Sequence, residues 1–280
     1  MTPSIQAVYG LKWNPFSTEV PVEAIHPSQK VEDFAWRVQH GVGKEGGFAL
    51  LTGSPGLGKS AALRVLAGRL DQVRELSVGI IEHPQSTLGD FYTELGACFG
   101  LALQPRSRWL GFRALRQQWV RHIERTLMRP ILLIDEAQEV SLPVLNELRI
   151  LSSTCFDSKI ILGVVFCGDE RFLERLSTQD LLPLGSRIRT RLVLEPASEE
   201  ELKACLMHRM AEAGNSALMT SALIKTLCEH SLGNMRILLQ MAGDLLAVAA
   251  KKERDVLDEK LYFEVFAPPK KAGVRRRKTS

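Results

Sequence analysis

Cysteine is scarce in this sequence, and its pattern shows no pairing. The five cysteines are an odd number, lie far apart and form no C-x-x-C pair. A chain of this length does not depend on disulfides, so we expect reduced and mostly buried thiols, which are typical of the cell interior. The longest uncharged stretch, residues 46–58, is shorter than the roughly 20 apolar residues of a membrane span. Without a basic segment and an apolar run at the N-terminus, we expect a cytoplasmic protein with no signal peptide and no membrane contact.

Aromatic residues and net charge are also low. Aromatics make up 6% of the 280 residues, and the net charge is +4. A hydrophobic share of 45% and a charged share of 24% exclude disordered and low-complexity classes and leave a globular protein. The small net charge conceals two basic segments. Residues 101–129 hold seven arginines against one glutamate, and residues 267–280 hold six basic residues and no acid.

Short apolar runs alternate with helical patterns over the first two thirds of the chain. Buried strands are expected at residues 48–52, 76–81, 131–134, 160–166 and 192–194. Apolar strands with intervening helices favour a parallel sheet that is covered on both faces. We therefore predict an α/β nucleotide-binding domain over residues 1–197.

The pattern changes after Pro196. Glycine–asparagine breaks separate helical patterns at residues 199–213, 221–230, 235–251 and 258–266. These predict a helical lid domain over residues 198–266. Residues 267–280 have little to bury and are expected to form a basic disordered tail.

The strongest motif follows the first strand. It is the G-x-x-x-x-G-K-S sequence of Gly53-Ser-Pro-Gly-Leu-Gly-Lys-Ser60. Glycines there let backbone N–H groups cradle phosphate oxygens, and the helix that follows adds a favourable dipole. Lys59 would contact the β- and γ-phosphates, and Ser60 would ligate Mg²⁺. The predicted ATP contacts in this motif are Gly53, Ser54, Pro55, Gly56, Leu57, Gly58, Lys59, Ser60 and Ala61.

A second motif follows the third strand, where Ile131-Leu-Leu-Ile134 ends in Asp135 and Glu136. Asp135 is predicted to hold Mg²⁺ together with Ser60, and Glu136 to polarise the attacking water. A carboxylate directly after the metal-organising aspartate indicates an ATP hydrolase with its own base. The sequence has no N-K-x-D guanine motif, so ATP is favoured over GTP.

Three further features are candidates for sensing or completing the site. Arg236, at the start of a lid helix, would contact the γ-phosphate or would be a plain surface arginine. Arg187 and Arg191, in Arg187-Ile-Arg-Thr-Arg191, would supply an arginine finger to a neighbouring subunit or form a solvated or DNA-facing turn. Asp169, after the fourth strand, occupies the position of a γ-phosphate sensor.

These motifs resemble an AAA+ ATPase, together with Asp135-Glu-Ala-Gln-Glu-Val-Ser141, Leu145-Asn-Glu-Leu-Arg149 and Gly233-Asn-Met-Arg236. Tyr9-Gly-Leu-Lys-Trp-Asn-Pro-Phe16 and Gly46-Gly-Phe-Ala-Leu-Leu-Thr-Gly53 are similar to the ExeA-like branch. That branch includes secretion-associated ATPases and transposition regulators related to TniB, TnsC and Mu B. Two departures stand out. Asp169 replaces the usual neutral polar residue, and we expect the protein to lack the membrane span and wall-binding module of the secretion ATPases.

The resemblance implies a P-loop fold of five parallel strands in the order 5-1-4-3-2 with a helical lid. It implies rings or filaments with ATP at each subunit interface, binding to duplex DNA, and recruitment of a transposase. It also places Asn14 and Phe16 near the adenine. Secretion-associated ATPases and replication-type loaders remain the alternative functions.

The arginine-rich segment supplies the sequence's own indication of DNA binding. Arginine binds phosphate through its bidentate fork, without reading sequence. The predicted DNA contacts are Arg106, Arg108, Arg113 and Arg116. A solvated helix face is the alternative, above all for Arg121, Arg125 and Arg129. Trp109 and Trp119 are expected to be core anchors.

Overall fold

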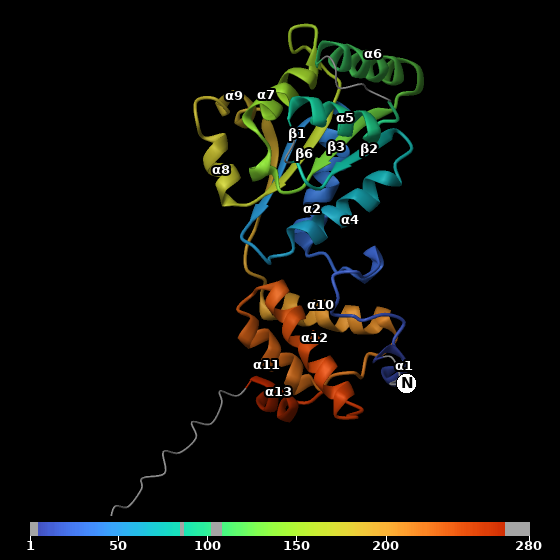
Figure 1. Ribbon diagram of the computed structural model, residues 1–280, viewed down its shortest axis with the longest axis vertical. Helices are drawn as coiled ribbons and strands as arrows, with labels where there is room; N and C mark the ends of the chain where they lie inside the picture. Colours follow the sequence, from blue (N-terminus) through green and yellow to red (C-terminus); the bar gives the residue numbers. More distant parts are fainter. Residues whose placement is uncertain (1–4, 85–86, 102–107, 267–280) are drawn as a thin grey trace, which may run out of the picture. The chain divides into compact units, whose positions relative to one another are not determined.

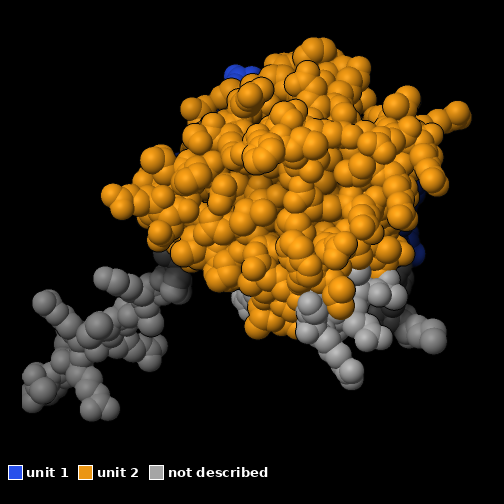
Figure 2. Space-filling model, turned by 90° about the horizontal axis from the view of Figure 1, so that it is seen from above, with its two compact units in different colours: residues 1–20, 198–233, 237–280 blue, residues 21–197, 234–236 orange. Residues whose placement is uncertain are grey.

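The computed structural model describes residues 5–84, 87–101 and 108–266. The chain divides into two compact units, which Figure 2 distinguishes by colour. The first, here called the α/β unit, comprises residues 21–197 and 234–236. The second, the helical unit, comprises residues 1–20, 198–233 and 237–280. The expected basic tail, residues 267–280, lies outside the described residues.

A parallel five-stranded sheet forms the centre of the α/β unit (Figure 1). Its strands are β1 (Gly47–Gly53), β2 (Leu76–Ile81), β3 (Arg129–Ile134), β6 (Gly163–Gly168) and β7 (Ile188–Leu194). They lie in the order β2-β3-β6-β1-β7. Counted along the chain, this is the predicted order 5-1-4-3-2, so the expected fold is confirmed.

Helices cover both faces of this sheet (Figure 1). One face packs against α2 (Gln29–Arg37) and α4 (Lys59–Asp71). The other packs against α5 (Leu88–Cys98), α6 (Arg108–Thr126), α7 (Leu142–Leu151), α8 (Glu170–Leu176) and α9 (Leu182–Gly185). Successive strand residues point to opposite faces, so Leu50 joins the second core and Leu51 the first. Continuous apolar strands are what this two-sided burial requires. The shorter elements of the unit are η1 (Val22–Ala24), η2 (Val38–Val42), α3 (Gly43–Glu45), η3 (Ala137–Glu139), β4 (Ser153–Thr154) and β5 (Lys159–Ile160).

The helical unit contains α10 (Glu199–Ala213), α11 (Ser221–Ser231), most of α12 (Met235–Lys251), α13 (Glu259–Phe266) and α1 (Ile5–Tyr9). Ser198 begins α10 with a capping box, in which Glu201 bonds back to the Ser198 backbone N–H. The sequence predicts residues 1–20 in the α/β domain, but their contacts place them in the helical unit. The reason is hydrogen bonding: Lys12 N–H donates to the Ala213 carbonyl at 2.8 Å, and the Tyr9 hydroxyl donates to the Arg254 carbonyl at 2.8 Å.

Three local expectations differ from the structure. The run at 160–166 is not one strand, because Ile160 pairs with Ser153 in the β4–β5 hairpin and β6 begins at Gly163. Strand β7 begins at Ile188, earlier than its apolar residues indicated, because it pairs with β1 along its length. Trp109 is 63% exposed, whereas Trp119 is 1% exposed as expected. None of the described helices is long and apolar enough to cross a membrane.

The two tryptophans of α6 provide a matched test of this packing. Trp119→Ala should lower the free energy of unfolding by about 3–5 kcal/mol, because it opens a cavity in the core. Trp109→Ala should change it by less than about 1 kcal/mol, because the ring is largely exposed. Urea titration of both variants measures the difference. Equal losses would show that Trp109 is also a core residue.

Candidate functional site

Glycines in left-handed conformations build the loop between β1 and α4. Gly56 and Gly58 have φ values of 87° and 97°, a region that only glycine adopts without strain. The backbone N–H groups of Gly56, Leu57 and Gly58 make no hydrogen bond to any other described residue outside α4. Free N–H groups at a helix start form a cradle for phosphate oxygens. The loop therefore fits the phosphates of a nucleotide.

Lys59 and Ser60 open the helix that follows this loop. The Lys59 ammonium donates to the carbonyls of Gly53 at 2.9 Å and Ser54 at 3.2 Å, so it folds over the loop. Ser60 is exposed in the first turn of α4. Phosphate oxygens would compete with these carbonyls for Lys59. The exposed hydroxyl of Ser60 and the carboxylate of Asp135 are oxygen ligands of the kind that Mg²⁺ prefers.

The acid pair leaves β3 at the same edge of the sheet. Asp135 accepts a hydrogen bond from the Glu136 backbone N–H at 2.9 Å. Glu136 is exposed and has a φ of 49°, which is left-handed. The side-chain amide of Gln138 donates to the Glu136 carboxylate, and its oxygen accepts from the Asp169 N–H at 3.1 Å. Gln138 is buried, and it fixes the carboxylate that we predicted to be the base.

Sequence reasoning missed Gln138, although it lies only two residues after Glu136. A glutamine in a short loop carries no distinctive pattern. Its role depends on Gly168, which is far along the chain. A Cβ on Gly168 would lie 2.9 Å from the Gln138 side-chain oxygen, so only glycine lets the amide approach β6.

A buried thiol lies beside Asp135. Cys167, on β6, is fully buried, and burial raises its pKa well above the ordinary value. The Asp135 carboxylate, with which the thiol shares a hydrogen bond, raises that pKa further. Cys167 therefore stays protonated at neutral pH. It supports the orientation of Asp135 and has no nucleophilic role in this state.

Asp169 is already engaged within its own helix turn. Its carboxylate accepts from the Arg171 backbone N–H at 3.0 Å and caps α8. It also pairs with the Arg171 guanidinium at 2.8 Å, and the same guanidinium lies 3.1 Å from Glu139. These contacts account for the charged residue at the position where a γ-phosphate sensor was expected.

The segment Asn234–Arg236 touches the phosphate loop within the α/β unit. The Asn234 amide donates to the Pro55 carbonyl at 3.1 Å, and the Arg236 backbone N–H donates to the Gly56 carbonyl at 3.1 Å. A Cβ on Gly56 would come within 2.4 Å of the Asn234 side chain. The exposed Arg236 side chain therefore starts from a backbone that is anchored on the loop.

Comparison with known proteins agrees with this geometry. Residues 41–176 match the family described as the AAA domain. This part of the chain is similar to that family. Its phosphate cradle, Lys59 and the acid pair Asp135–Glu136 are the residue set of an ATP hydrolase.

One curated relative is General secretion pathway protein A from Aeromonas hydrophila, which is 29% identical over 246 residues. The match covers 86% of this chain and 44% of that protein, so the chain spans less than half of the relative's length. This similarity agrees with the expected likeness to the secretion-associated branch.

Solved structures share the fold. Cdc6p from Pyrobaculum aerophilum has a TM-score of 0.69 at 15% identity, over 87% of this chain and 67% of that chain. A chain of the Drosophila ORC bound to DNA has a TM-score of 0.68 at 17% identity, over 95% of this chain and 67% of that chain. At these identities the likeness concerns the fold alone.

The arginines before and within β7 differ in their partners. Arg187 forms an ion pair with Asp157 at 2.6 Å. Arg191 donates to the Gly185 carbonyl at 2.9 Å. Arg189, which lies between them, is exposed and has no hydrogen bond or ion pair with any described residue. Intramolecular contacts thus hold both finger candidates, Arg187 and Arg191.

The arginine-rich segment divides into anchored and free side chains. Arg108 forms a bidentate pair with Glu147, which is 2% exposed and also accepts from the Tyr92 hydroxyl. Arg116 donates to the Ser153 carbonyl at 2.7 Å, and Arg129 to the Ile160 carbonyl at 3.1 Å. The exposed arginines without a partner among the described residues are Arg113, Arg121 and Arg125. Arg106 lies outside the described residues.

Asn14 and Phe16 are held within the helical unit. Phe16 is buried, and its N–H donates to the Asn14 side-chain oxygen at 3.0 Å. The buried Arg209 of α10 donates to the carbonyls of Pro15 and Ser17 at 3.0 and 3.1 Å. This turn is therefore rigid, and its predicted contact with the adenine stays a prediction.

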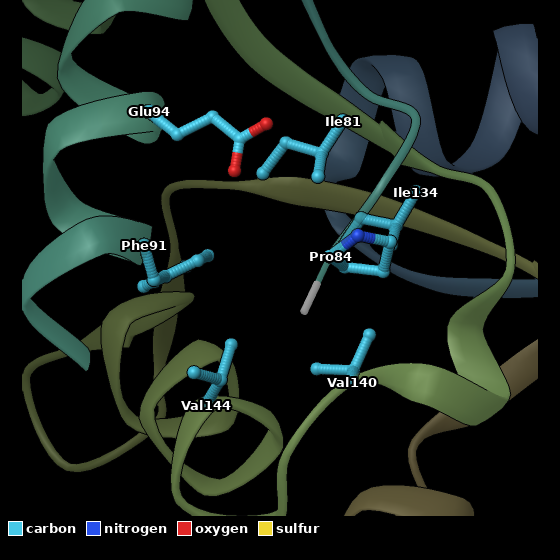
Figure 3. A pocket seen from close by; sticks show the side chains of 7 residues that line it. All are labelled: Ile81, Pro84, Phe91, Glu94, Ile134, Val140 and Val144. Atoms are coloured by element: carbon cyan, nitrogen blue, oxygen red, sulfur yellow. The ribbon is translucent and has the colours of Figure 1, made fainter. Parts of the chain in front are cut away.

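A small, mostly apolar pocket is lined in part by Ile134, the residue before Asp135 (Figure 3). Burial raises the pKa of Glu94, which reaches into the pocket from α5. The pocket volume of about 10 Å³ admits about one water molecule. The pocket is therefore not a nucleotide site. Its lining residues are Ile81, Pro84, Phe91, Glu94, Ile134, Val140 and Val144.

Thiol labelling tests the burial of Cys167. Only Cys155 is exposed among the five cysteines, and burial raises the pKa of Cys98, Cys167, Cys205 and Cys228. Because the thiolate is the reactive form, we expect one fast-reacting thiol at pH 8 and five after denaturation. Cys155→Ser should remove the fast phase. A fast phase that survives in this variant would contradict the buried position of the others.

Proposed function

We propose that this protein is an ATP hydrolase that binds duplex DNA, self-associates into a ring or filament and directs a transposase or other target-selection factor. The observation that carries the proposal is the row of free arginines on α6 of an AAA domain whose phosphate loop and acid pair are both present. The same unit therefore carries a basic surface that can bind a polyanion and a site that can hydrolyse ATP.

In this proposal each residue of the loop and acid pair has a separate task. The loop N–H groups and Lys59 bind the β- and γ-phosphates of ATP, and Ser60 and Asp135 hold Mg²⁺. Mg²⁺, when bound, neutralises charge on the phosphate oxygens. Glu136 orients the attacking water and accepts its proton, and Gln138 keeps that carboxylate in place. Arg236 contacts the γ-phosphate in the same subunit, whereas Arg187 or Arg191 acts on the ATP of a neighbouring subunit.

The free arginines of α6 supply the DNA contact. Arg113, Arg121 and Arg125 fall within an arc of about 120° and extend over about 18 Å at 1.5 Å per residue. That length is about half a turn of duplex DNA. Arg108 and Arg116, which the sequence favoured, already satisfy partners inside the AAA domain. The ORC structure, which has a similar fold, is bound to DNA.

A secretion-associated ATPase is the second candidate function, because the relative from Aeromonas hydrophila is a general secretion protein. That function does not require DNA. ATP hydrolysis that is indifferent to duplex DNA, together with no DNA binding at 50–200 mM salt, would favour it.

Variants of the acid pair and the phosphate loop test the link between ATP and DNA. Glu136→Gln should bind ATP, lower kcat by at least about 100-fold because the base is lost, and accumulate DNA-bound assemblies. Lys59→Ala should lose ATP binding and assembly together. Negative-stain microscopy with duplex DNA and a non-hydrolysable ATP analogue reports assembly directly. If Lys59→Ala still assembles on DNA at physiological salt, the proposed ATP gating is wrong.

Charge removal on α6 tests the DNA surface. Replacing Arg113, Arg121 and Arg125 with glutamine should weaken binding to all sequences alike. It should also make the slope of log K against log salt shallower by roughly 2–3, because about one counterion is released per phosphate contact. The control variant also removes three positive charges, by replacing the exposed residues Lys44, Arg74 and Lys260 with glutamine. If both variants lose the same DNA affinity and salt dependence, net charge and not the α6 surface accounts for binding.

A further inference from the structure

The β4–β5 hairpin carries an unusual tip. Between Thr154 and Lys159 the chain reverses through Cys155, Phe156 and Asp157, whose φ values are 51°, 55° and 65°. Three successive left-handed residues without a glycine are disfavoured by contact between the Cβ atom and the backbone. Such a conformation persists only where surrounding contacts fix it, and it is found preferentially at functional sites.

The fixing contacts converge on Asp157. One of its carboxylate oxygens accepts from the Ser153 hydroxyl, and the other lies 2.6 Å from the Arg187 guanidinium. Both contacts lower the pKa of Asp157, so the carboxylate is charged at neutral pH. Ser158 closes the turn by donating from its hydroxyl to the Cys155 carbonyl at 2.6 Å.

The base of the hairpin is held as firmly as its tip. Arg116 of α6 donates to the Ser153 carbonyl on β4, and Arg129 donates to the Ile160 carbonyl on β5. Lys159 pairs with Glu124 at 3.0 Å. Anchored side chains from α6 and from the start of β3 thus hold a short hairpin that has no core of its own.

The anchored hairpin exposes Phe156 at its tip. Its side chain is fully exposed, at 107% of the reference area. A large apolar side chain with no intramolecular burial gains nothing from folding. The described fold thus holds a large apolar side chain at a position that it does not bury.

We propose that Phe156 packs against a second copy of this chain, and that Asp157 positions Arg187 at the same subunit contact. This rests on the proposed function, in which Arg187 or its neighbour acts on the ATP of an adjacent subunit. Phe156 and Asp157 are consecutive, so a subunit that covers the phenyl ring also meets the carboxylate holding Arg187. Asp157 is 58% exposed next to Phe156, and a charged carboxylate at the tip disfavours a polyanion as the occupant.

Phe156→Ala tests the subunit contact without touching the fold. Because the side chain is fully exposed, Tm should stay unchanged. The protein concentration at half-maximal specific ATPase activity should rise by roughly tenfold or more, as expected for one lost apolar anchor. Phe263→Ala is the matched control, since Phe263 is 59% exposed on α13. It should leave that midpoint unchanged.

Three outcomes of this measurement are distinguishable. An unchanged midpoint in Phe156→Ala overturns the proposed contact. Weaker DNA binding with unchanged assembly overturns it as well and assigns the tip to nucleic acid. Wild-type activity that does not depend on protein concentration refutes the self-association in the proposed function itself.

Asp157→Asn tests the positioning of Arg187. The variant should lower kcat at saturating protein by roughly tenfold, the fold-change of a lost charged hydrogen bond, and leave KM for ATP unchanged. In an Arg187→Ala background the same substitution should have no further effect on kcat. A full additional loss in that background would show that Asp157 acts through the stability of the hairpin, and Tm of the single variant would fall with it.

Discussion

The parallel register of β1, β3 and β6 is the constraint on which the candidate site depends. Thr52 lies level with Gly168, and Ile134 with Phe166. The phosphate loop, the acid pair and the β6–α8 junction therefore leave the sheet at one edge. A shift of one residue would exchange Leu50 and Leu51 between the two cores. It would also shift the phosphate loop relative to the acid pair. The packing of the two cores and the geometry of the site therefore depend on the same strand register.

Around the acid pair, a network of hydrogen bonds holds the Glu136 carboxylate in a fixed position. Arg175 donates to the carbonyls of Gln138 and Val140, and Gln138 in turn links Glu136 to the Asp169 N–H. Each group satisfies another, so none of these contacts leaves a buried polar atom unpaired. The left-handed backbone of Glu136 is tolerated because this network over-determines it.

Those parts of the fold and site that are local in sequence could be predicted. Apolar runs bounded by glycine located the strands, and the G-x-x-x-x-G-K-S spacing located the loop. The missed features depend on distant partners. Glu147 holds Arg108 from 39 positions away, and Asp157 holds Arg187 from 30. Residues 1–20 join the helical unit through carbonyls near residues 213 and 254. The hydrophobic periodicity of a segment carries no information about such distant pairings.

The arginine-rich segment shows why counting charges is insufficient. Glu147 is 2% exposed, so its charge must be paired, and Arg108 is the cation that pairs with it. Removing Arg108 would leave the buried Glu147 carboxylate without its cation, which is unfavourable and keeps Arg108 from leaving for a phosphate. Arg116 and Arg129 are likewise committed to hairpin carbonyls. Three guanidinium groups of α6 therefore have no partner among the described residues, whereas three of the six described arginines of the segment are held by the fold.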